Sequence, residues 1–154
     1  MKRRKRHIAV DTQGFLLGVV VHLASIQDRD GALLVFRELF QRFPRLHHFW
    51  ADAGYRGKPV KWATDVFGWT MEIVKHWWTG RTGFWVGPGQ EPPAIPTGFV
   101  PLPHRWIVER TFAWLTTNRR LVVEYDELPE SSEARVHLAM SRLMTTRLAR
   151  LASP

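Results

Sequence analysis

Two acidic residues, Asp52 and Glu109, are of the type and in the setting that metal-dependent chemistry requires. Asp52 directly follows a predicted strand and precedes Gly54 and Gly57, so the backbone can turn sharply and expose the carboxylate at the carboxyl end of that strand. Mg²⁺ prefers carboxylate oxygens, and two such ions can stabilise both oxygens of a phosphodiester displacement. The sequence therefore predicts that the carboxylates of Asp52 and Glu109 lie on one side of a sheet, about 4–8 Å apart, and share two metal ions.

Glu109 belongs to a helix predicted over residues 105–115, which contains neither proline nor glycine. Apolar stripes flank it, with Val108, Phe112 and Leu115 on one side and Ile107 and Trp114 on the other. We expect a carboxylate between two such stripes to lie close to the core. The alternative is an ordinary boundary glutamate that forms an ion pair with Arg105 or Arg110.

The charge of the chain indicates a polyanionic partner. Its 22 Lys and Arg residues outnumber the 14 Asp and Glu residues, which gives a formal net charge of +8, and nucleic acid is the commonest polyanion. Two basic groups are candidate phosphate contacts. They are the amino-terminal arm Lys2, Arg3, Arg4, Lys5 and Arg6, and the pair Arg119 and Arg120. For the first, a solvated tail is an equally good explanation. For the second, the structural explanation is that a helix carboxyl end favours cations.

Length and composition restrict the class of protein. A chain of 154 residues with 45% hydrophobic residues is predicted to fold as one domain. The absence of cysteine excludes disulfides and thiolate metal sites and fits a reducing compartment. The longest apolar run, residues 15–21, is too short to span a membrane. We expect a cytoplasmic protein with no membrane partner.

The order of elements predicts a mixed α/β fold. Two β-rich runs, 7–10 and 15–23, flank the turn Asp11–Gly14, in which Asp11 is most simply the turn residue. A helix follows, capped by Asp28 or Asp30, with Leu33, Phe36, Phe40 and Phe43 on its apolar face. The remaining elements are a strand at 46–51, a helix at 58–67, a strand at 70–75, a Gly/Pro-rich insert at about 79–103, the 105–115 helix and a long helix at about 132–151.

Rival sites have weaker support. His47 and His48 are adjacent, so on a strand their side chains point to opposite faces and cannot share zinc. Most of the eight tryptophans are core candidates, whereas Trp77, Trp78 and Trp85 around the insert could stack on bases.

Several short motifs occur in a fixed order along the chain. They are Arg4–Thr12, Gln27–Ala32, Ala51–Gly57, Glu72–Lys75, Gly98–Pro103 leading into the 105–115 helix, and Tyr125 with Ser132–Ala134. In this order they closely resemble the C-terminal catalytic part of bacterial insertion-sequence transposases of the DDE type, specifically the insertion-sequence-five family. The chain departs from that family's signature at Leu102, where tyrosine is common, and at Thr116, where lysine is common.

The resemblance implies a ribonuclease-H-like mixed sheet with flanking helices, in which three acidic residues hold two Mg²⁺ ions. By position, Asp52 matches the second acid, Glu109 the third, and Arg105 an arginine that usually engages DNA phosphate. Arg56 is a further candidate DNA contact. The family's first catalytic Asp lies on a central strand that precedes the motif beginning here at Arg4, so we expect that strand to be missing. Asp11 matches a turn position, and its use as a substitute ligand is the less favoured alternative.

We therefore expect residues 1–154 to form a single partial catalytic domain. The complete enzyme would cleave DNA at the element ends and join it to target DNA, as a homo-oligomer, with an upstream-frame segment supplying the missing strand. The alternative is a non-catalytic, basic DNA-binding remnant of a transposase.

Overall fold

The computed structural model describes residues 4–74, 89 and 104–152. At its centre lies the predicted hairpin, in which β1 (Arg4–Val10) pairs antiparallel with β2 (Leu16–Leu23). Asp11 closes the turn, because its Oδ1 accepts hydrogen bonds from the backbone N–H groups of Gln13 and Phe15, both at 2.8 Å. Asp11 is thus the turn residue that the sequence indicated, and β1 begins three residues earlier than predicted.

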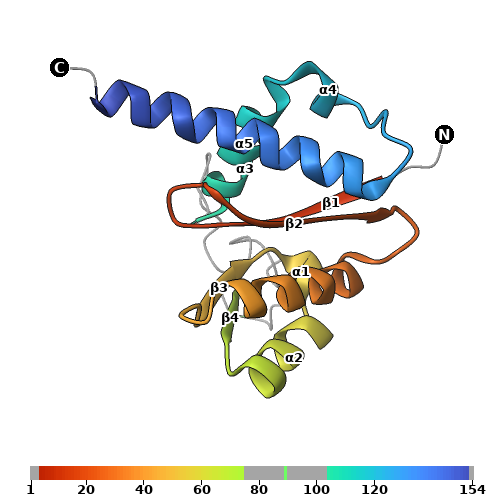
Figure 1. The fold of residues 1–154 in the computed structure, drawn as a ribbon. Helices are drawn as coiled ribbons and strands as arrows, with labels where there is room; N and C mark the ends of the chain where they lie inside the picture. The colour runs from red at the N-terminus through yellow and green to blue at the C-terminus, as the bar shows by residue number, and fades with distance from the viewer. Residues whose placement is uncertain (1–3, 75–88, 90–103, 153–154) are drawn as a thin grey trace.

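The hairpin is covered on both faces (Figure 1). Its pairing register shifts between Ala9, which pairs with Gly18, and Val10, which pairs with Leu16, so one extra residue is accommodated in β2. Beyond this bulge the side chains of β2 alternate, with Val19 and Val21 facing one cluster of apolar residues and Val20 the other. Burial on both faces explains why β2 reads as a nearly continuous apolar run.

One layer consists of α1 (Asp28–Arg42), α2 (Lys58–Phe67) and a parallel pair of strands, β3 (His48–Ala51) and β4 (Thr70–Ile73). The boundaries of α2 are as predicted, and Gly68 ends the helix in the left-handed conformation at φ 67°. The core of this layer comprises Ala32, Val35, Phe36, Leu39, Ala63, Trp69 and Met71.

One expectation about α1 was wrong and a second was only partly right. Gln27 is the N-cap residue and makes no side-chain capping bond, so neither Asp28 nor Asp30 caps the helix. The buried face is partly as predicted, since Phe36 is buried and Leu33 and Phe43 pack against the core, but Leu39 is fully buried whereas Phe40 is 48% exposed. The helix is rotated about its axis toward Ala32 and Leu39, because the hairpin and β3 approach it from that side.

The other layer contains α3 (Arg105–Thr116), the short α4 (Arg119–Val122), which was not predicted, and α5 (Pro129–Ala152). In Figure 1 these helices lie across the face of the hairpin opposite to α1 and α2. Val136 and Met140 of α5 pack on Val19 and Val21, together with Leu115 and Leu121. Met144, Leu148 and Leu151, farther along the same helix, remain 41%, 64% and 83% exposed.

The mixed α/β class is confirmed. In the described residues the strands make two separate two-stranded sheets, β1–β2 and β3–β4. The insert at about 79–103 and the three tryptophans beside or within it lie outside the described residues, apart from Gly89. No helix in the described part of the chain is long and apolar enough to cross a membrane.

Candidate metal and DNA site

Asp52 stands at the carboxyl end of the parallel strand pair, immediately after β3. It is the N-cap residue of the 3-10 helix η1 (Ala53–Tyr55), and its Oδ1 accepts a hydrogen bond from the Gly54 backbone N–H at 2.8 Å. The residue is exposed. The turn thereby fixes one carboxylate oxygen and leaves the other free to accept a ligand, which is the exposed strand-end position that the sequence predicted.

A second carboxylate, that of Asp28, lies beside Asp52. A Cβ atom placed on Gly54 would be 3.1 Å from Oδ1 of Asp52 and 3.7 Å from Oδ2 of Asp28, so both carboxylates border this glycine. Asp28 accepts a bond from the Lys5 ammonium at 2.9 Å, and chiefly this bond lowers the pKa of the carboxyl. Sequence reasoning treated Asp28 only as a helix cap, because nothing local indicates that α1 begins next to the β3 turn.

A buried histidine pair holds the Asp52 turn against the hairpin. His7 and His22 are only 5% and 6% exposed, and their rings stack with centroids 4.6 Å apart. Nδ1 of His7 is bonded to the Tyr55 hydroxyl at 2.7 Å, which ties β1 to η1. The Nε2 atoms of both histidines have no hydrogen-bond partner among the residues that the structure describes. A Cβ on Gly31 would come within 2.6 Å of His7 Nε2 and 2.3 Å of His22 Nε2. Only glycine therefore fits at this position of α1.

The surroundings favour the neutral forms of His7 and Tyr55. Burial lowers the pKa of His7 and the neighbouring His22 lowers it further, against the opposing effect of Asp28. Burial likewise raises the pKa of Tyr55, and the negative charges of Asp52 and Asp28 add to that effect. A neutral histidine and a neutral phenol suit the hydrogen bond between them.

Acidification should therefore weaken the fold. The folded state holds the pKa of His7 below the ordinary value of 6.5, so below about pH 6.5 the unfolded chain binds a proton that the folded chain does not. The free energy of unfolding is expected to fall as the pH drops from that value through the folded-state pKa. Asp28 and Glu124 stay charged across this range, since their pKa values are lowered. Urea unfolding of the wild type and of His7→Asn at several pH values measures the effect, and an equal pH dependence in both would contradict it.

Glu109 is more exposed than its flanking stripes suggested. Its side chain is 62% exposed, and Oε1 accepts a bond from the Arg105 guanidinium at 2.8 Å. The buried face of α3 consists of Ile107, Thr111 and Leu115 instead. The expectation of a carboxylate held close to the core was wrong, because the helix packs through Thr111, whose hydroxyl donates to the Gly14 carbonyl of the hairpin turn at 2.7 Å.

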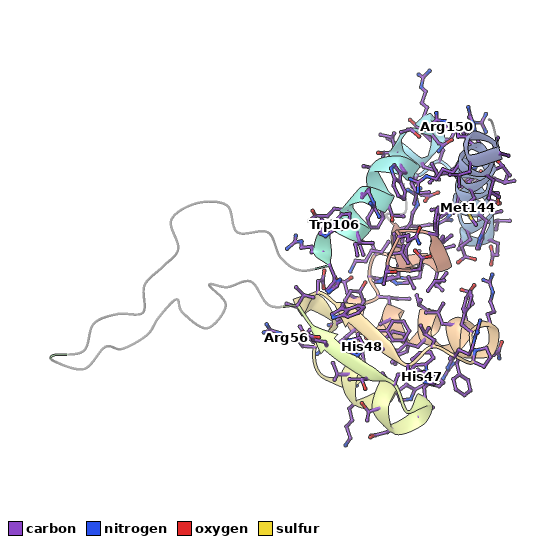
Figure 2. The ribbon with its side chains drawn as sticks, turned by 90° about the vertical axis from the view of Figure 1, so that its left-hand side faces the viewer. His47, His48, Arg56, Trp106, Met144 and Arg150 are labelled. Atoms are coloured by element: carbon purple, nitrogen blue, oxygen red, sulfur yellow. The ribbon has the colours of Figure 1, made fainter. Side chains whose placement is uncertain are left out.

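The start of α3 nevertheless lies against the strand that leads to Asp52. His104, at the N-terminus of α3, stacks on Trp50 of β3 with ring centroids 4.2 Å apart. In Figure 2 the labelled Trp106 of α3 and Arg56 of the Asp52 turn lie on the same side of the molecule. No three histidine, aspartate or glutamate side chains among residues 4–74 and 104–152 are grouped to hold a metal ion. Mg²⁺ can be held by only one or two protein carboxylates, with water completing its coordination, so such a small set of carboxylates still fits this ion.

The basic residues fall into two groups. Arg4, Lys5 and Arg6 belong to β1, so they are not an extended arm, and each has partners within the protein. Arg6 donates to the Leu121 carbonyl and pairs with Glu124, each at 2.7–2.8 Å, while Arg4 donates to the carbonyls of Asp126 and Glu127. Arg56, Arg119 and Arg120 are exposed instead. Lys2 and Arg3 lie outside the described residues.

Comparison with known proteins gives one family match. Residues 2–71 match the family described as Transposase DDE domain. The matched segment contains the hairpin, α1, Asp28, Asp52 and α2, and this match supports a DDE-type transposase. No curated protein and no solved structure matches the chain significantly.

Proposed function

We propose that this chain is part of a bacterial DNA transposase of the insertion-sequence-five family, acting on DNA in the cytoplasm. Its activity in the complete enzyme would be Mg²⁺-dependent phosphodiester cleavage at the element ends, followed by strand transfer into target DNA. One observation carries this proposal. The segment that matches the transposase family contains Asp52, and its carboxylate is exposed at the carboxyl end of a parallel strand pair.

Asp52 and Glu109 are the proposed metal ligands. Asp52 offers the oxygen that its turn leaves free, whereas Glu109 would have to exchange its bond to Arg105 for the metal. Bound Mg²⁺ would activate the attacking oxygen and stabilise charge on the phosphate. Arg105 matches an arginine that usually engages DNA phosphate in the resembled family, so its guanidinium is proposed to contact a phosphate near the metal.

The complete domain is proposed to be ribonuclease-H-like. The two separate strand pairs support this, because a further strand between β1 and β3 would join them into one mixed sheet and satisfy backbone groups along both strands. An upstream-frame segment would supply that strand together with the first of the three acids, and the active form would be a homo-oligomer.

The proposed DNA contacts are the exposed arginines Arg56, Arg119 and Arg120, together with Lys2 and Arg3. Arg105 is a further proposed contact. Arg4, Lys5 and Arg6 were included on the sequence, but contact with phosphate would cost them their present partners. The formal net charge of +8 favours binding that is largely independent of DNA sequence and weakens with salt.

Metal sharing is the first test. Mn²⁺, a paramagnetic substitute for Mg²⁺, is expected to broaden the NMR signals of residues 52–54 and 108–110 together. Asp52→Asn should remove both effects, while Asp65→Asn, which changes an exposed carboxylate on α2, should leave them intact. Broadening at only one of the two segments, or equally at unrelated acids, would refute the shared site.

The second candidate function is a non-catalytic DNA-binding remnant. The ion pair between Arg105 and the exposed Glu109 favours it, because Glu109 then has an ordinary surface role. This candidate predicts salt-sensitive DNA binding that Mg²⁺ does not strengthen, and no joint broadening by Mn²⁺.

A further inference from the structure

A pocket lies between the beginning of α1 and the turn that follows Asp52. It is lined by Lys5, Gln27, Asp28, Arg29, Ala53, Gly54 and Arg56. These residues come from β1, the start of α1 and η1 with its flank, so three segments that are distant in sequence form one surface. The proposed metal ligand Asp52 adjoins it, since Gly54 of the pocket wall donates to the Asp52 carboxylate.

Positive charge is in excess among the residues that line the pocket. Its lining contains three cations and one carboxylate. The carboxylate of Asp28 is paired with Lys5 at 2.9 Å. Arg29 and Arg56 are both exposed, and neither side chain has an ion pair or hydrogen bond within the described residues. In Figure 2, Arg56 projects outward from the ribbon. Two unpaired guanidinium groups at one pocket suit an anion with several oxygens.

The backbone that carries Arg56 is fixed from two directions. The Asp52 carboxylate closes the turn on Gly54, and the Tyr55 hydroxyl is bonded to the buried His7 at 2.7 Å. Arg29 is held by its place in the first turn of the 15-residue helix α1. The two arginines therefore start from rigid elements, and binding an anion between them orders side chains without reorganising the backbone.

We propose that this pocket binds a phosphate group of DNA between Arg29 and Arg56. The inference rests on the proposed function and deepens it, because the phosphate would be placed next to the Asp52 carboxylate. Arg29 thereby joins the DNA-contacting residues, although sequence reasoning did not select it. Lys5 stays paired with Asp28 and shapes the pocket wall without contributing a free charge.

The test measures binding of a short fluorescent DNA duplex to the 154-residue chain over a range of salt concentrations. Arg29→Gln and Arg56→Gln are each expected to weaken binding and to reduce the slope of log K against log salt by about 1. Arg45→Gln is the matched control, since Arg45 is exposed and follows the opposite end of α1. It should change the slope much less. Thermal unfolding of each variant should stay close to the wild type, because the replaced side chains have no ion pair or hydrogen bond with other described residues.

The outcomes separate this inference from the proposed function. Salt-sensitive DNA binding with an unchanged slope in both pocket variants would overturn the pocket and leave the proposed function standing. A wild-type chain that binds no DNA would overturn both. Inorganic phosphate alone, at matched ionic strength, serves as the second probe. Saturable phosphate binding that Arg29→Gln abolishes, with an unaltered DNA slope, would assign the pocket to a free phosphate and overturn the inference.

Discussion

Substituting Asp52 by alanine is expected to reduce Mg²⁺-dependent nicking of DNA by about a thousandfold or more, because a metal ligand contributes several kcal/mol of charge stabilisation in the transition state. The loss should be this large because Asp52 alone combines the strand-end position, the exposed carboxylate and the family match. Nicking of a supercoiled plasmid measures it, with the chain extended by an upstream segment that carries an Asp-bearing strand. Asp65→Ala, which removes another exposed carboxylate, is the control.

The 154-residue chain by itself is expected not to nick DNA. Two carboxylates leave each Mg²⁺ with most of its water, so the ions bind weakly and their separation is not fixed. If the short chain cuts DNA and Asp52→Ala abolishes the cutting, no acid from outside this chain is needed. Asp28 would then be the leading third ligand, since it borders Gly54 together with Asp52. Asp11 is a poorer substitute, because its Oδ1 already accepts two backbone bonds in the hairpin turn.

Arg6→Ala is expected to lower the free energy of unfolding by about 2–4 kcal/mol. Arg6 and Glu124 are each only 19% exposed, and the guanidinium also donates to the Leu121 carbonyl and to Ser132. Burial by itself would raise the pKa of Glu124, but the bonds from Ser132 and Arg6 outweigh it and keep the carboxyl charged. Removing Arg6 leaves that charge without its cation and separates β1 from α4 and α5.

Arg42→Ala provides the comparison for this effect in urea unfolding. Arg42 pairs with Glu38 at 2.6 Å on the surface of α1, with its side chain 49% exposed, so the loss should stay below about 1 kcal/mol. Similar losses in the two variants would show that the bonds of Arg6 across the fold contribute little. Unchanged stability in Arg6→Ala would return this residue to the proposed DNA contacts.

The sequence alone determined the features that depend on local chemistry. Asp11 and Gly14 specify the hairpin turn, because a side-chain acceptor and a residue that tolerates positive φ are both required there. Pro59, in the first turn, specifies the start of α2, and Gly68, in the left-handed conformation, specifies its end. The exposed position of Asp52 followed from a strand ending before two glycines. In each case the determining residues lie within a few positions of the feature.

Tertiary structure decided which side of each element is buried and which distant residues meet. Leu39 is buried and Phe40 exposed because the hairpin and β3 approach α1 from one side, which no property of α1 reveals. Arg6 reads as part of a basic arm until β1 places it beside Glu124, 118 residues away. On the sequence, Asp28 is a helix-cap candidate. In the structure, α1 begins next to the Asp52 turn, so the side chains of Asp28, Arg29 and Arg56 border one pocket. These pairings arise from long-range packing, whose free energy depends on the whole set of contacts and not on the sequence around each residue.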